Sequence, residues 1–166
     1  VKEMRDEVTA ILNVAQKGDE VVVSVESPGG MVSGYGLAAA ELVRVRDAGL
    51  QLTVCVDKVA ASGGYMMACT AHKIIAAPFA ILGSIGVLAQ VPNVHRLLKQ
   101  HNIDYEEITS GQYKRTVSVF GEITENGREK FKEQIQDTHQ LFKTWVHTYR
   151  PQLDLDKVAT GEFWFG

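Results

Sequence analysis

The sequence predicts an α/β fold in which helices cover both faces of a mostly parallel sheet. Two β-branched, apolar segments, residues 21–25 and 52–56, alternate along the chain with segments of helical periodicity. Such alternation is typical of parallel strands joined by right-handed helical crossovers. The 166 residues are 45% apolar and 22% charged, as in an ordinary globular domain. The sequence contains no repeat or linker, so we expect residues 1–166 to form a single domain.

Each element follows from local periodicity. Apolar residues at Met4, Val8 and Ile11 predict a helix at the N-terminus. The first strand ends at the turn sequence S-P-G-G, and a helix is predicted over 36–46. The later segments are a strand at 52–56, a small-residue segment at 60–71, a short strand at 73–76, a helix at 94–100, an extended segment at 105–108 and a long amphipathic helix from about residue 124.

Charge and composition exclude several functions. The net charge of −3 and the pI of about 6.0 provide no attraction for polyanions, so nucleic acid is not an expected partner. Cys55 and Cys69 lie in apolar stretches where reduced cysteines commonly pack, and a disulfide between them is unsupported. We expect neither a cofactor nor a metal. No apolar run is long enough to span a membrane. Both ends look cut, so we expect a fragment whose membrane anchor and C-terminal end lie outside this chain.

Three glycine-containing loops stand out, although alone the first and third read as ordinary turns and the second as a small-residue helix start. In the first loop, Gly29 follows a strand, and a residue without a side chain lets a carbonyl oxygen approach the backbone closely. In the second loop, Ser62 lies where a strand gives way to a helix, a position that exposes a nucleophilic hydroxyl. The third loop, G-S-I-G-V at 83–87, contains Ser84.

Together these loops resemble the signal peptide peptidase A family of serine-lysine peptidases (peptidase S49), within the fold shared by caseinolytic proteases and crotonases. The motifs that carry the resemblance are E-S-P-G-G at 26–30, D-K-V-A-A-S-G-G-Y at 57–65 and G-S-I-G-V at 83–87. The second motif continues as M-M-A and, together with G-Q-Y-K-R-T at 111–116, is similar to the SohB subgroup. The match extends from about Val21 to the end of the chain.

The resemblance implies peptide-bond hydrolysis with defined roles. Ser62 would be the nucleophile, Lys114 the general base, and Ser84 the residue that orients the lysine amine. Gly29 would donate an oxyanion-hole N–H together with the amide of Ser62. Residues that would line the substrate site are Gly30, Met31, Ile85, Gly86 and Val87.

The resemblance also implies a setting. The expected substrates are signal-peptide remnants or unfolded segments of membrane proteins, bound in an extended conformation. Relatives are expected to form homo-oligomeric rings at the bacterial inner membrane, with the catalytic domain in the periplasm.

The residues support a lysine base independently. A serine hydroxyl needs a neighbouring base. The chain has five histidines, His72, His95, His101, His139 and His147, none of which lies in a glycine-rich loop, so we expect them to be solvated. A lysine that acts as a base near pH 7 must be neutral, which requires a pKa about 3 units below the usual value. Lys58 and Lys114 compete for this role, and we expect Lys58 to be a surface charge at the end of a strand.

Two alternatives remain at this point. A crotonase-type acyl-CoA enzyme would also use paired backbone N–H groups, but neither A-A-S-G-G at 60–64 nor G-S-I-G at 83–86 contains a carboxylate. A non-catalytic assembly module would keep the fold for self-association. The presence of both Ser62 and Lys114 favours the peptidase.

Overall fold

The computed structural model describes residues 1–166. The chain divides into two compact units, residues 1–86 with 141–166 and residues 87–140, and each is described by itself. The single peptidase domain expected from the sequence stays a prediction. None of the helices is long and apolar enough to cross a membrane.

The first unit contains most of the secondary structure. Its elements are α1 (Lys2–Val14), β1 (Glu20–Ser24), α2 (Val32–Asp47), β2 (Gln51–Val56), β3 (Val59–Ala61), α3 (Gly63–Ala68), β4 (Lys73–Ala76), β5 (Ile81–Gly83), the C-terminal part of α5 (Glu125–Tyr149), α6 (Leu155–Val158) and β6 (Phe163–Phe165).

The second unit holds α4 (His95–Gln100) and the beginning of α5. The extended segment predicted at 105–108 does not pair as a strand and belongs to an irregular stretch between the two helices. The side chain of Asn93 fixes this stretch by donating to the carbonyl oxygens of Ser118 and Gly121 at 2.8 and 2.9 Å.

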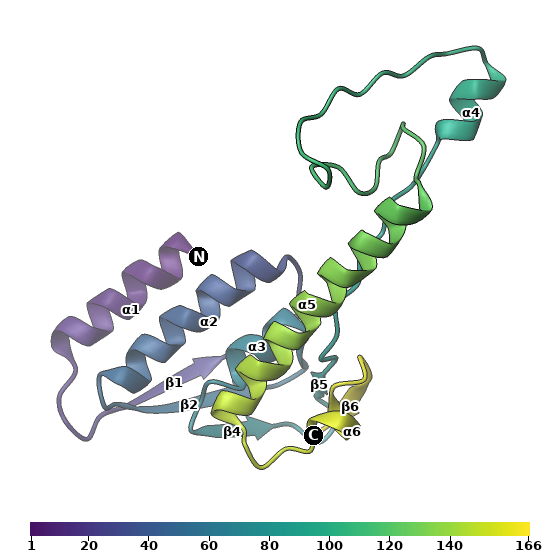
Figure 1. Ribbon diagram of the computed structural model, residues 1–166. Coiled ribbons are helices and arrows are strands. Elements are labelled where there is room, and N and C mark those ends of the chain that lie inside the picture. The colour runs from purple at the N-terminus through teal and green to yellow at the C-terminus, as the bar shows by residue number, and fades with distance from the viewer. The chain divides into compact units, whose positions relative to one another are not determined.

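The main sheet is parallel, as predicted, with the strand order β1-β2-β4. Figure 1 shows α1 and α2 side by side over this sheet. The prediction of helices on both faces is wrong within this chain, because Val22 on the edge strand β1 is 61% exposed and Ile75 on β4 is 46% exposed. Alternate residues of β1 are exposed, so its run of valines reflects β propensity and not burial on both faces.

A second, smaller sheet has the order β3-β5-β6, in which β3 and β5 are parallel and β6 is antiparallel to β5. Ser27 extends it by a parallel bridge to Ala60. These strands were not predicted from the sequence, because each is only three residues long. This sheet positions the site, because Ser62 follows the end of β3 and Ser84 follows the end of β5.

The core anchors α3 beneath the site. Val146 of α5 is fully buried in a cluster with Tyr65, Met66 and Cys69 of the α3 segment. The indole N–H of Trp145 donates to the carbonyl oxygen of Met66 at 2.9 Å. The long helix therefore packs, as predicted, and fixes the helix that follows Ser62.

Candidate active site

Ser62 lies between β3 and α3 in a backbone conformation that is rare for a residue with a side chain. Its φ is 52° and its ψ is −119°. Such a conformation is strained in residues other than glycine and is commonly found at functional sites. The side-chain hydroxyl is half-buried and makes no hydrogen bond with another group of the chain. The strand-to-helix position predicted for the candidate nucleophile is therefore confirmed.

Backbone hydrogen bonds hold this conformation from both sides. The N–H of Ser62 donates to the carbonyl oxygen of Gly83 at 2.8 Å, and the N–H of Ala61 donates to that of Ser27 at 3.0 Å. The Ser62 amide is thus occupied within the chain. The prediction that it contributes to an oxyanion hole is wrong in this arrangement.

Gly29 packs directly against Ser62. A Cβ at Gly29 would lie 2.6 Å from the Ser62 Cβ and 2.9 Å from the nitrogen of Gly63, and the φ of Gly29 is +101°. Only glycine fits such a close approach in the left-handed region. The N–H of Gly29 donates to the Ser27 hydroxyl at 3.2 Å. The structure therefore brings Gly29 to Ser62, as predicted, but with its amide already bonded.

Two other N–H groups are available. Those of Gly30 and Gly63 have no acceptor within the protein. Gly63 is buried, and a buried residue whose N–H has no acceptor is unusual. It begins α3, where the first amides of a helix lack intrahelical partners. Gly63 was not among the predicted site residues, although its place immediately after the candidate nucleophile was a usable signal.

Ser84 directly follows Gly83, whose carbonyl oxygen accepts the N–H of Ser62. It also has a positive φ of 50°, and its N–H donates to the carbonyl oxygen of Glu162 at 2.7 Å. Its hydroxyl makes no hydrogen bond within the chain. The carbonyl group of Gly83 therefore connects the loop that contains Ser84 with the loop that contains Ser62.

The residues predicted to line the substrate site are dispersed. Met31 is 78% exposed at the start of α2, whereas Ile85 is 1% exposed and belongs to the core. The N–H of Gly86 donates to the carbonyl oxygen of Ser84 at 2.9 Å. Val87 begins the second unit. Among the residues predicted to line the substrate site, Met31 therefore has a large apolar side chain that is freely accessible.

The two candidate lysines differ in their surroundings. The Lys58 amine lies 3.0 Å from a carboxylate oxygen of Glu26, and both side chains are exposed, so the prediction of a surface charge is confirmed. Lys114 lies in an exposed turn of the second unit, and its N–H donates to the carbonyl oxygen of Gly111 at 3.1 Å. Its amine forms no ion pair within that unit.

The remaining titratable groups near α3 are not poised for catalysis. Burial raises the pKa of the Cys69 thiol to about 12, and burial also raises the pKa of Tyr65 to about 12. Both cysteines are free. Partial burial, together with the charges of Arg46 and Arg150, lowers the pKa of His72, whose Nδ1 accepts the N–H of Leu52 at 3.0 Å. No three metal-ligating side chains cluster in the structure.

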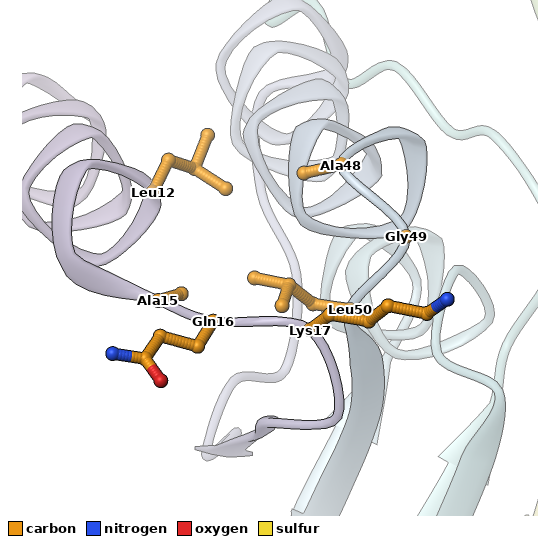
Figure 2. A pocket seen from close by; sticks show the side chains of 7 residues that line it. All are labelled: Leu12, Ala15, Gln16, Lys17, Ala48, Gly49 and Leu50. Atoms are coloured by element: carbon orange, nitrogen blue, oxygen red, sulfur yellow. The ribbon is translucent and has the colours of Figure 1, made fainter.

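Two cavities of the first unit lie apart from the Ser62 hydroxyl. One, of about 390 Å³, lies between the end of α1 and the end of α2, where Leu12 and Leu50 face it (Figure 2). Another, of about 320 Å³, lies between α1 and the start of α2. The second is lined by Met31 and Tyr35, among others, and so adjoins the first glycine loop.

Comparison with known proteins identifies the family. The chain matches peptidase family S49 over residues 44–166 and the N-terminal region of peptidase family S49 over residues 1–42. It is 60% identical over 163 residues to a probable protease SohB from Haemophilus influenzae, covering 98% of this chain and 46% of that protein. A probable protease SohB from Buchnera aphidicola is 56% identical over 166 residues, covering 100% of this chain and 54% of that protein.

More distant matches are also proteases. Protease 4 from Salmonella typhi is 28% identical over 88% of this chain and 24% of its own length. The ClpP protease catalytic domain from Plasmodium falciparum matches with a TM-score of 0.57 at 11% identity, over 99% of this chain and 69% of that one, which shows the fold. The chain spans about half the length of the SohB relatives. With its predicted α/β fold confirmed and both regions of the family matched, the chain belongs to peptidase family S49.

Proposed function

We propose that this chain provides the catalytic site of a serine endopeptidase that uses Ser62 and Lys114 to hydrolyse peptide bonds. One observation carries the proposal. The free hydroxyl of Ser62, at a φ of 52°, lies beside a glycine loop, and the N–H groups of Gly30 and Gly63 have no acceptor in the protein. A nucleophile next to unpaired donors is the arrangement that acyl transfer requires.

In the proposed reaction, Ser62 Oγ attacks the carbonyl carbon of the peptide bond and its proton passes to the neutral amine of Lys114. The carbonyl oxygen becomes negatively charged and accepts hydrogen bonds from the N–H groups of Gly30 and Gly63. The C–N bond then breaks, and the leaving amine takes the proton from Lys114. Water attacks the acyl-enzyme, gives its proton to Lys114, and releases the acid, after which the proton returns to Ser62.

In this proposal Ser84 orients the lysine amine. Its hydroxyl is free, and Ser84 directly follows Gly83, whose carbonyl oxygen accepts the N–H of Ser62. Lys114 is exposed within residues 87–140.

The proposed substrates are unfolded peptide segments, including signal-peptide remnants and pieces of membrane proteins. Gly30, Met31 and the segment 85–87 would contact such a segment, with Met31 offering an accessible apolar side chain. The family resemblance further supports a ring of identical subunits at the bacterial inner membrane, with the catalytic part in the periplasm. Sedimentation of the intact protein as a monomer at all concentrations would contradict the ring.

Labelling with a serine-reactive fluorophosphonate tests the nucleophile. We expect the intact protein to be labelled at Ser62 and to degrade an unfolded protein such as dye-labelled casein. Ser62→Ala should abolish both without changing the thermal unfolding midpoint, because it removes one small, unbonded oxygen. Ser24→Ala, which alters an exposed serine on β1, is the matched control. An unlabelled wild type would favour the non-catalytic assembly module. An active Ser62→Ala variant would contradict the assignment of Ser62 as the nucleophile.

A further inference from the structure

The ring of Tyr35 packs against both glycines whose N–H groups are free. Tyr35 is in the first turn of α2 and is half-buried. A Cβ at Gly30 would lie 2.9 Å from the Tyr35 Cε2, and a Cβ at Gly63 would overlap the same ring. The aromatic ring therefore touches both glycine backbones, one from the first loop and one from the start of α3. The ring is therefore one group that limits where both backbones can lie.

The hydroxyl of Tyr35 fixes the first loop by a second route. Its oxygen lies 2.7 Å from the Ser27 Oγ, and that same Oγ accepts the N–H of Gly29 at 3.2 Å. The backbone of Ser27 is in turn bonded to β3, since its N–H donates to the carbonyl oxygen of Val59 at 2.8 Å. One side chain thus connects α2, the glycine loop and the strand that leads to Ser62.

We propose that Tyr35 is a positioning residue that sets the separation and direction of the Gly30 and Gly63 N–H groups. This inference rests on the proposed function, because those groups matter only if an oxyanion forms beside Ser62. Tyr35 itself is not proposed to touch the reacting atoms. Its ring packs against both glycines, and its hydroxyl holds the loop by ordering Ser27 and keeping the Gly29 N–H occupied.

Such a role affects the transition state more than substrate binding. Donors aimed at a developing negative charge act mainly on kcat, and the loss of one oxyanion-hole donor costs about 100- to 1000-fold. Tyr35→Phe keeps the ring and loses only the bond to Ser27, so a fall in kcat of about tenfold is expected. Tyr35→Leu also removes the ring that packs against both glycines, so a fall of about 100-fold is expected.

The test measures kcat, KM and the rate of fluorophosphonate labelling on the intact protein with a fluorogenic unfolded substrate. We expect both Tyr35 variants to lower kcat and the labelling rate with KM nearly unchanged. Ser27→Ala should resemble Tyr35→Phe, and the double variant should be no worse than either, because both break the same chain of bonds. The matched control is Tyr149→Phe, which removes a half-buried tyrosine hydroxyl from α5.

The outcomes separate this inference from the proposed function. If the wild type shows no activity that depends on Ser62, the proposed function fails first. If the wild type is active and Tyr35→Phe has the same kcat as the control variant Tyr149→Phe, positioning by the hydroxyl is refuted. A rise in KM at constant kcat would also overturn it, because that pattern indicates a direct substrate contact. Should Tyr35→Leu unfold, Tyr35→Phe decides alone, because it keeps the ring that packs against the core cluster of Tyr65 and Met66.

Discussion

Replacing Gly29 with alanine tests the close approach between the first glycine loop and the candidate nucleophile. The new Cβ would lie 2.6 Å from the Ser62 Cβ, 2.9 Å from the Gly63 nitrogen and 3.0 Å from the Ala61 carbonyl oxygen. Two of these atoms belong to the backbone and cannot rotate away. The loop must therefore move away from Ser62, or α3 must shift.

The magnitude follows from two costs. A non-glycine residue in the left-handed region costs roughly 1–2 kcal/mol. Overpacking of a tight site adds about 1–3 kcal/mol. Together they lower the free energy of unfolding by about 2–5 kcal/mol, which for a domain of this size corresponds to a fall in the unfolding midpoint of roughly 4–20 °C. The displaced loop also misplaces the Gly30 N–H, so labelling of Ser62 should slow by at least about 100-fold.

Gly18→Ala is the matched control. The φ of Gly18 is +103°, against +101° for Gly29, but a Cβ there meets nothing within 4 Å. It therefore carries the backbone cost without the clash. We expect a loss of roughly 1–2 kcal/mol by thermal unfolding and an unchanged labelling rate. Equal unfolding midpoints for the two variants, with Ser62 labelled at the wild-type rate in both, would refute the reasoning.

The remaining predictions concern the lysines and a histidine. Lys114→Ala and Lys114→Arg should both lose nearly all casein hydrolysis, because arginine keeps the charge but does not accept a proton. Lys58→Ala should retain it, since an exposed ion pair with Glu26 is worth at most about 1 kcal/mol; an active Lys114→Arg would contradict the dyad. His72 has a lowered pKa in the folded state, so its contribution to stability is complete above the unfolded value of about 6.5 and is lost as the pH falls through the folded pKa. Thermal unfolding between pH 8 and pH 5 should therefore show a steeper acid loss for the wild type than for His72→Gln, and parallel profiles would contradict this.

Much of the main sheet could be predicted from the sequence. The strand expected at 73–76 is β4, that expected at 52–56 begins one residue after β2 does, and that expected at 21–25 is shifted by one residue from β1. These strands are long enough for β-branched residues to give a clear signal. The strands β3 and β5 could not be found in this way, because three-residue segments that contain alanine and glycine carry no periodicity.

The site was predictable at the level of its loops. The glycines marked them, and the structure brings Gly29 against Ser62. Which amides are occupied could not be predicted, because that depends on pairing between distant strands, such as the bond from Ser62 to Gly83. Tyr35 was overlooked for a similar reason. In the sequence it is one residue of a helix, and its contact with Gly63 exists only in three dimensions.

The pairing of β5 with β6 bears on when the site can form during synthesis. Gly83 accepts the N–H of Ser62, and a Cβ at Gly83 would lie 2.8 Å from the Trp164 ring, which is near the end of the chain. Ser84 is likewise bonded to Glu162. Such long-range contacts form late, because the intervening chain must first be made and folded. A ribosome-bound chain that ends before Glu162 should therefore lack a fixed loop at Ser62, and this loop should become ordered only after residues 162–164 have emerged.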